Sequence, residues 1–261
     1  MARVSFVVPA YNEELLLPRT LAALRDASAV LGGAGHDAEI IVADDASEDR
    51  TAEIAEASGA TVVRVRNRQI AATRNAGAAR ATGDILVFVD ADSIVPPDAA
   101  VAAVGALEAG YAYGACPIRF DGRVSRTVRV LLWLMMLGYR VLGLSSGAFL
   151  FCTREAFDAA GGFDERYYAA EETILARRLR RIGRYAWIRH PVTTSARKIR
   201  TYTLLELFGE LARLCVRGPG HVRKRGGLDL WYGPRRTDPD PLGDACGSAR
   251  GRAKAAEAEA R

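Results

Sequence analysis

Two aspartates, Asp90 and Asp92, stand one residue apart where an apolar run over residues 85–89 ends. Side chains alternate along a strand, so positions i and i+2 can point the same way. Facing carboxylates repel each other unless a cation lies beside them, and a hard divalent ion that also binds substrate phosphates meets that need. The pair therefore predicts a metal site, although a solvated loop with a helix cap explains the same residues.

Two further acids, Glu171 and Glu172, stand at the start of an expected helix over residues 171–182. Acids in a first helical turn are favoured by the helix dipole, which is a sufficient structural reason for them. The functional interpretation is a general base, held near a substrate hydroxyl.

The sequence contains no glycine-rich nucleotide-binding motif, but side chains could still hold a nucleotide. There is no G-x-G-x-x-G after the first apolar run and no G-x-x-x-x-G-K-[ST] anywhere, so neither a dinucleotide fingerprint nor a P-loop is supported. Tyr11 can stack on a base and Asp45 can meet a base edge, while a metal holds the diphosphate. The structural alternatives are a packed aromatic residue and a turn residue.

Strands and helices alternate along the first hundred residues. We expect strands over residues 4–8, 38–44, 60–65 and 84–90, and helices over residues 13–30, 49–58 and 69–81. This alternation predicts an α/β fold with a mostly parallel sheet that helices flank on both faces. The polar stretches PAYNEE, DDASEDRT and DADS follow three of the strands. They should meet at the carboxyl edge of the sheet, where open sheets bind ligands.

The second half of the chain is less regular and more helical. We expect helices over residues 123–144, 154–160, 171–182 and 204–216, and strands in GAFLFCT and YAWIRH. A length of 261 residues allows one large α/β domain or two small ones. After about residue 237 the composition turns to Asp, Pro, Gly, Ala, Arg and Glu, which predicts a disordered tail over residues 237–261.

The net charge and the cysteines indicate which partners and which cellular compartment to expect. The net charge is +5, and between residues 177 and 236 the only acids are Glu206, Glu210 and Asp229. Such an excess of basic residues predicts an anionic partner: phosphate, acidic lipid or nucleic acid. The four cysteines lie far apart, which indicates a reduced, cytosolic chain. We expect neither a secretion signal nor a membrane-spanning helix, because charge, serine and glycine interrupt the apolar stretch over residues 130–151.

Five stretches in order make the chain resemble family 2 inverting glycosyltransferases of the GT-A fold. They are VVPAYNEE, VADDASEDRT, ATRNAGAARATGDILVFVDADS, GAFLFCTREAFDAAGGFDE and EETILARRLRRIG, and they cover roughly residues 3–200. The resemblance implies a Rossmann-like GT-A domain over residues 1–236. Its nucleotide-binding half would be residues 1–95, and its partly helical acceptor half residues 96–236.

The resemblance also implies a nucleotide-sugar donor, UDP-linked more often than GDP-linked, and Mg²⁺ or Mn²⁺. Asp90 and Asp92 would hold the metal on the diphosphate, with His190 or His221 as a third ligand. By the same match, the nucleotide-binding residues would be Pro9, Tyr11, Asn12, Glu13, Asp44, Asp45, Arg68, Arg74 and Asp90.

The implied reaction is a single displacement that inverts the anomeric carbon of a hexosyl group. Family members usually carry Glu-Asp where this chain has Glu171-Glu172, and the Asp is the base. Glu172 occupies the position of that Asp, with its carboxylate displaced by about one bond length, which matters to such chemistry. Glu171 is the second candidate. Arg197 and Lys198 either meet the donor phosphate or belong to a solvated basic face.

The acceptor is expected to be a lipid-linked or cell-envelope hydroxyl, as in many relatives. Arg123, Arg126 and Arg129 precede an apolar body, which describes either an interfacial helix on an anionic membrane or an internal helix packed on the sheet. The expected location is therefore the cytoplasm, with peripheral contact to the inner face of the membrane.

Three other classes of protein remain as alternatives. The run VFVDADSI imitates the nucleophile strand of haloacid-dehalogenase-like phosphatases, but three strand–helix units precede it and no later G-D-x-x-x-D follows. A nucleic-acid-binding scaffold lacks any module signature. The third is a glycosyltransferase-like protein that has lost catalysis and acts as a binding protein at a membrane surface.

Overall fold

A computed structural model describes residues 1–122, 125–203, 206, 209, 221–228, 232–233 and 238 of the chain. Most of the expected helix over residues 204–216, almost all of the expected tail and Arg123 lie outside these residues.

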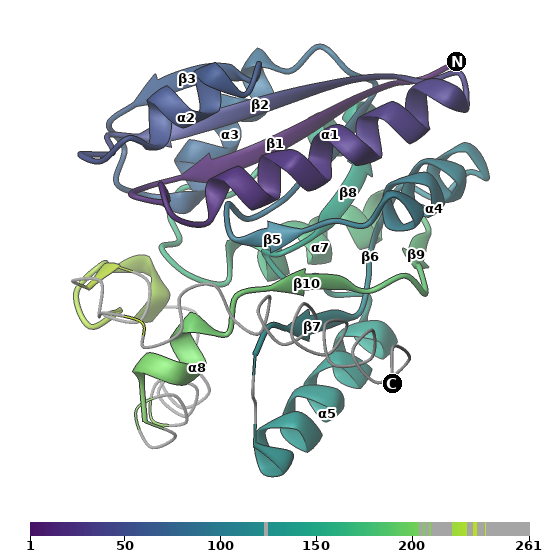
Figure 1. Cartoon of the computed structure of the whole chain (residues 1–261). Helices are drawn as coiled ribbons and strands as arrows, with labels where there is room; N and C mark the ends of the chain where they lie inside the picture. The colour runs from purple at the N-terminus through teal and green to yellow at the C-terminus, as the bar shows by residue number, and fades with distance from the viewer. Residues whose placement is uncertain are drawn as a thin grey trace, which may run out of the picture.

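A seven-stranded sheet forms the centre of the fold, in the order β3-β2-β1-β4-β8-β6-β9 (Figure 1). The strands are β1 (Arg3–Ala10), β2 (Asp37–Asp45), β3 (Thr61–Val65), β4 (Ile85–Phe88), β6 (Tyr113–Ala115), β8 (Leu150–Thr153) and β9 (Tyr185–Trp187). Strand β8 runs antiparallel to both of its neighbours, and the other pairings are parallel. The expected mostly parallel α/β sheet is confirmed, and its reversed strand was not predicted.

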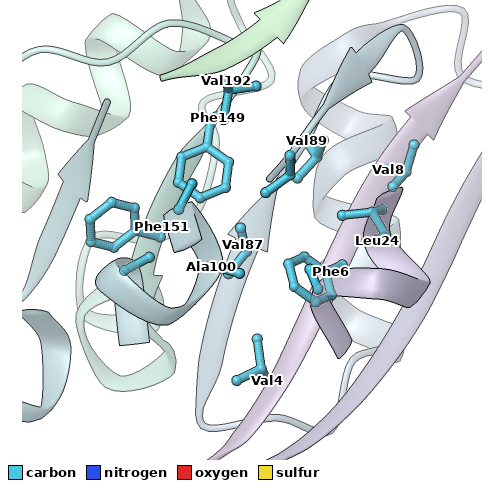
Figure 2. Packing of buried hydrophobic residues seen from close by; sticks show 14 of the residues in the cluster. Val4, Phe6, Val8, Leu24, Val87, Val89, Ala100, Phe149, Phe151 and Val192 are labelled. Carbon is cyan, nitrogen blue, oxygen red and sulfur yellow. The ribbon is translucent and has the colours of Figure 1, made fainter. Parts of the chain in front are cut away.

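Helices cover both faces of this sheet. Side chains of α1 (Leu17–Gly33), α2 (Thr51–Ala57) and α4 (Pro97–Glu108) pack on one face, where Phe6, Leu24, Val87 and Ala100 meet (Figure 2). Side chains of α3 (Ile70–Arg80), α6 (Arg154–Ala159) and α7 (Glu171–Ile182) pack on the other. Because both faces are covered, β1 and β4 are apolar along almost their whole length.

A second sheet of three short strands lies beside the carboxyl end of β4. Its order is β5 (Ser93–Ile94), β10 (Val192–Thr194) and β7 (Ile118–Phe120). Strand β10 pairs antiparallel with β5, with Thr194 opposite Ser93. This pairing places the short helix α8 (Arg197–Thr201) and the residues before it next to the Asp90–Asp92 pair. A 3-10 turn, η1 (His221–Arg223), lies further along the chain.

Helix α5 (Arg126–Leu142) extends away from the main sheet at the bottom of Figure 1. Val128 is its only buried residue, and most of its large apolar side chains are exposed. Of the two expectations for this segment, the internal packed helix is therefore wrong. In the described part of the chain, no helix combines the length and the apolarity that crossing a bilayer requires.

Several expected boundaries were misplaced by three or more residues, including the start of the strand expected in GAFLFCT, which begins at Leu150. The first helix begins at Leu17 rather than at residue 13, because Asn12 has a left-handed backbone (φ 49°) and the Glu13 carbonyl accepts from the N–H groups of Leu16 and Leu17 in a turn. The strand expected over residues 185–190 ends at Trp187 and turns back through His190 into β10.

The contact between α3 and the sheet gives a test of the packing. A Cβ added at Gly77 would lie 2.5 Å from Cγ1 of Val7, whereas one at Gly105 in α4 would meet nothing within 4 Å. Gly77→Ala should therefore lower the free energy of unfolding by about 1–3 kcal/mol through overpacking. Gly105→Ala should raise it by about 0.4–1 kcal/mol, because a helical glycine loses backbone entropy on folding. Urea denaturation followed by circular dichroism measures both. Equal effects would contradict the described packing of α3.

Candidate active site

A cavity of about 540 Å³ opens at the carboxyl ends of β1, β2 and β4. The structure thus brings together the polar stretches that follow these three strands, and it adds the start of α7, the start of α8 and part of the C-terminal segment. The side chains with polar or charged groups on its wall are Tyr11, Asn12, Glu13, Asp45, Arg68, Gln69, Thr73, Arg74, Asp90, Asp92, Glu171, Glu172, Arg197, Lys198, Thr201, Tyr202, Arg225 and Tyr232.

The guanidinium of Arg74 joins acids from two distant parts of the chain. Arg74 lies on α3 and is 2% exposed. It donates from Nη2 to Asp90 Oδ1 and from Nη1 to Glu171 Oε1, each at 2.7 Å. Its Nη2 also reaches the Gly147 carbonyl at 3.4 Å. The adjacent carboxylates raise the pKa of Arg74 against the effect of burial, so the guanidinium stays charged.

Glu171 and Glu172 differ in their surroundings. Glu171 is 3% exposed and bonded to Arg74, whereas the side chain of Glu172 is 21% exposed. Oε2 of Glu172 lies 4.0 Å from Arg74 and has no hydrogen-bond partner among the described residues. Burial, with repulsion from Glu172, raises the pKa of the Glu171 carboxyl to about 8 against the opposing effect of Arg74. Glu171 is therefore held in place by its arginine, while Glu172 offers an oxygen without a bond.

A second cation, Arg197, joins the other acids of the cavity. It donates to both oxygens of Glu13, at 2.9 and 3.1 Å, and lies 3.5 Å from Asp92 Oδ2. Thr194 of β10 donates to Asp92 Oδ1 at 3.2 Å. Burial raises the pKa of Asp92 to about 6, and the negative charges of Glu13 and Asp90 add to the shift. Asp92 is thus a crowded carboxylate that a further cation would stabilise.

Asp45 holds the backbone that leads into α3. Its Oδ1 accepts from the N–H groups of Asn67 and Arg68 at 2.7 and 2.8 Å. Its Oδ2 accepts from the Gln69 N–H at 3.0 Å and from the Thr73 hydroxyl at 2.9 Å. Four donors occupy about as many sites as a carboxylate offers. In this structure Asp45 therefore positions the segment over residues 67–69.

That segment carries Arg68 over the aromatic ring of Tyr11. The guanidinium carbon lies 3.9 Å from the ring centroid, a cation–π distance. One face of the Tyr11 ring therefore meets a planar cation, so Arg68 and Tyr11 form this part of the wall together.

Left-handed backbone is concentrated around the cavity. Among the described residues other than glycine, positive φ angles occur at Asn12, Ala46, Arg68 and Ala170. Asn12 and Arg68 line the cavity, and Ala46 and Ala170 directly adjoin Asp45 and Glu171. Such conformations cost free energy and persist where surrounding contacts fix them, which is typical of functional sites.

Several wall residues had no signal in the sequence. Tyr232 accepts from the Ile70 N–H at 3.4 Å, and Arg225 lies 5.3 Å from its ring. Both belong to a C-terminal segment without helical or strand periodicity. Gln69 lies within a recognised helix but in no motif, and Thr73 lies in the stretch ATRNAGAARATGDILVFVDADS without having been singled out. Thr194, which bonds to Asp92 but does not line the cavity, was missed because β10 itself was not expected.

Two predicted site residues lie outside the wall. Asp44 is buried at the end of β2, and His190 is exposed in the turn between β9 and β10. Neither lines the cavity. The side chain of His221 is outside what the structure describes.

The residues present suit a hard divalent ion shared with a phosphate ligand. Over the described residues, no group of three or more His, Cys, Asp or Glu side chains is arranged to hold a metal. Asp90 and Asp92 still supply two carboxylates at the cavity. Burial raises the pKa of Asp92 most, and the negative charges of Glu13 and Asp90, which a cation would offset, add to the shift. Mg²⁺ is commonly bound by one or two carboxylates, with water and substrate phosphates as its other ligands.

Comparison with known proteins places this geometry in a family. The model of "Glycosyl transferase family 2" matches residues 5–163. The chain is 38% identical over 116 residues to an undecaprenyl-phosphate 4-deoxy-4-formamido-L-arabinose transferase from Klebsiella pneumoniae subsp. pneumoniae, covering 42% of this chain and 35% of the relative. A transferase of the same description from Pseudomonas paraeruginosa is 40% identical over 102 residues, or 36% of this chain and 29% of the relative. The chain thus spans about a third of the length of these curated relatives.

Two solved structures share the fold. A mannosyltransferase from Pyrobaculum calidifontis in complex with GDP-Man and Mn²⁺ superposes with a TM-score of 0.60 at 23% identity, over 81% of this chain and 64% of that chain. A glucosyl-3-phosphoglycerate synthase from Mycobacterium tuberculosis, in complex with Mn²⁺, UDP and glucosyl-3-phosphoglycerate, has a TM-score of 0.54 at 26% identity. It is matched over 82% of this chain and 77% of that chain.

The raised pKa of Glu171 predicts a particular pH dependence of stability. A carboxyl whose pKa is higher in the folded than in the unfolded state stabilises the fold at low pH, and this contribution is lost as the pH rises toward about 8. In Glu171→Gln this titration is absent. The unfolding free energy of the variant relative to wild type should therefore rise with pH, by up to about 1.4 kcal/mol per pH unit, between about pH 5 and pH 8.

Urea denaturation at a series of pH values measures this slope. Glu155→Gln removes an exposed carboxylate on α6 and is the control, with a flat difference expected. A flat difference for Glu171→Gln as well would mean that Arg74 keeps Glu171 ionised in the fold, and would contradict the assigned protonation.

Proposed function

Since the chain belongs to glycosyl transferase family 2 and is a glycosyltransferase, we propose that it moves a hexosyl group from a nucleotide sugar to an acceptor hydroxyl, with inversion and with the help of a divalent cation. One observation supports this most: Glu172, whose buried Oε2 has no hydrogen-bond partner among the described residues, lines the same cavity as the Asp90–Asp92 pair. A base and a diphosphate-binding pair are the two parts that such a transfer needs.

The donor would lie along the ends of β1, β2 and β4. In the proposal, the nucleoside lies against the wall formed by Pro9, Tyr11 and Arg68, and Asp45 reaches the base edge when a ligand replaces one of its internal donors. UDP is the preferred nucleotide and GDP the alternative. The M. tuberculosis relative, at 26% identity, was solved with UDP and Mn²⁺.

Asp90 and Asp92 would hold Mg²⁺ or Mn²⁺ on the donor diphosphate. When bound, this ion supplies Lewis-acid stabilisation of the charge that develops on the leaving diphosphate. Arg197 and Lys198 at the start of α8 add positive charge on the same side. Arg74 fixes the orientation of Asp90 by its bond to Oδ1.

Glu172 would act as the base. Its carboxylate takes the proton from the acceptor hydroxyl while the hydroxyl oxygen bonds to the anomeric carbon. The bond from that carbon to the diphosphate oxygen breaks, and the electron pair leaves with the nucleoside diphosphate. Glu171 is then a positioning residue, because Arg74 holds it and the helix turn carries Glu172 directly after it.

The need for a general base depends on the class of acceptor. The curated relatives are named as transferases to undecaprenyl phosphate, and a phosphate oxygen is already ionised near neutral pH. A hydroxyl, in contrast, must lose its proton during attack. We therefore propose a hydroxyl acceptor for this chain, carried by a lipid-linked or other cell-envelope molecule.

The kinetic test compares a variant of Glu172 with a variant of an exposed glutamate. Glu172→Gln should lower kcat for transfer by about 10²–10⁴-fold, the usual contribution of a general base, and should leave the binding of nucleotide with Mn²⁺ unchanged. The measurement is release of nucleoside diphosphate from a panel of UDP- and GDP-sugars with a panel of hydroxyl acceptors. Glu155→Gln, on the exposed face of α6, is the matched control and should keep full activity. Wild-type activity in Glu172→Gln would remove Glu172 as the base, and a wild-type chain that binds donor but transfers to no acceptor would favour a binding protein.

A further inference from the structure

The surface of α5 is unusually apolar for an exposed helix. Val130, Trp133, Leu134, Leu137 and Val141 are each between 42% and 69% exposed. They recur at intervals of three and four residues, so they form one stripe along the helix. Single exposed apolar residues are ordinary, but a contiguous apolar stripe of this length marks an interaction surface.

Basic residues border this stripe. Arg129 and Arg140 are eleven residues apart, which is close to three helical turns, so they lie on the same side of α5 beside the stripe. Arg126 stands in its first turn. The sequence from residue 122 to residue 154 contains no Asp or Glu, and no acid on α5 offsets these charges.

Helix α7 extends the positive charge of this surface. Arg180 donates to the Leu142 carbonyl at 2.7 Å, which ties α7 to the end of α5. Arg177, Arg181 and Arg184 are exposed on and just after α7. Arg180 therefore adds positive charge at the C-terminal end of α5, and the helix that carries it has further exposed arginines.

We propose that α5 is a membrane-docking helix, which lies in the interface of a bilayer that contains anionic lipids. Its 17 residues span about 25 Å along the surface. The apolar stripe would enter the boundary between headgroups and acyl chains, and the arginines would meet lipid phosphates.

The charge pattern favours a bilayer over a second copy of the chain. A symmetric dimer through this stripe would bring the same patch of each copy together. Arg126 and Arg140 of the two copies would then approach each other, and α5 carries no acid on either copy. An anionic bilayer offers both the apolar layer and the opposite charge. This inference goes beyond the transfer reaction, because it needs neither donor nor base.

Vesicle co-sedimentation of the full chain tests the proposal. We expect binding to vesicles of phosphatidylcholine with phosphatidylglycerol, weaker binding to phosphatidylcholine alone, and weakening by salt. Trp133→Glu should reduce vesicle binding by at least about tenfold. The change removes a large apolar side chain that would insert into the bilayer, and it adds a negative charge that anionic lipids repel. Val101→Glu places the same charge at an exposed valine of α4, away from α5, and should bind as wild type does.

Further measurements keep the outcomes distinct. Circular dichroism and Mn²⁺-dependent nucleotide binding should be the same in Trp133→Glu as in wild type, which separates docking from folding and from the donor site. If the wild-type protein binds vesicles but no nucleotide, this result would count against the transferase mechanism and would support docking. The docking proposal is overturned by equal binding of Trp133→Glu and wild type or by absence of vesicle binding. Sedimentation velocity that shows a dimer abolished by Trp133→Glu, without vesicle binding, would likewise overturn it.

Discussion

Carboxylates crowded at one end of the sheet are the constraint on which the site depends, and Arg74 is the group that makes the crowding possible. Its guanidinium lies between Asp90, from the end of β4, and Glu171, from the start of α7. Removing such a buried cation leaves charges without compensation, at a cost of several kcal/mol, on the order of 3–5. The bond between Arg74 and Glu171 also positions Glu172, which is the next residue of α7. The proposed base therefore depends on a contact in which it takes no part.

Arg197 repeats this arrangement on the other side of the cavity. It comes from the second half of the chain and meets Glu13 and Asp92 from the first. Each arginine thus links the two halves across the cavity, and both pairings rely on elements outside the regular βα units. A diphosphate with a divalent cation carries small net charge, and such a ligand can enter this nearly balanced set of charges without a large new repulsion.

Helix α5 lies at a distance from these residues, and its exposed surface is apolar and basic.

The first half of the fold could be predicted because its signals are local. Continuous apolar runs marked β1, β2 and β4, and the acids of α7 marked its start at Glu171. The rest depends on pairings between distant residues. The antiparallel direction of β8 is defined by its pairing with β4 and β6, which no local pattern shows. Strands β5 and β10 are two and three residues long, too short for an alternation of apolar and polar residues to be visible. The expected role of Asp45 came from its residue type and its position after a strand, and that of His190 came from a resemblance. No local pattern in the sequence could show that four internal donors meet Asp45 or that His190 lies in an exposed turn.

The central claim is that the acids at the end of β4 receive a metal–nucleotide complex. Titration calorimetry of UDP and of GDP into the protein, with and without Mn²⁺, tests it most directly. The comparison includes Asp92→Ala and, as control, Asp26→Ala at an exposed position of α1. The account predicts that one nucleotide binds only with Mn²⁺ and that Asp92→Ala weakens this binding by at least about tenfold, while Asp26→Ala does not. Equal binding without the metal or in Asp92→Ala, or no binding of either nucleotide, would contradict it.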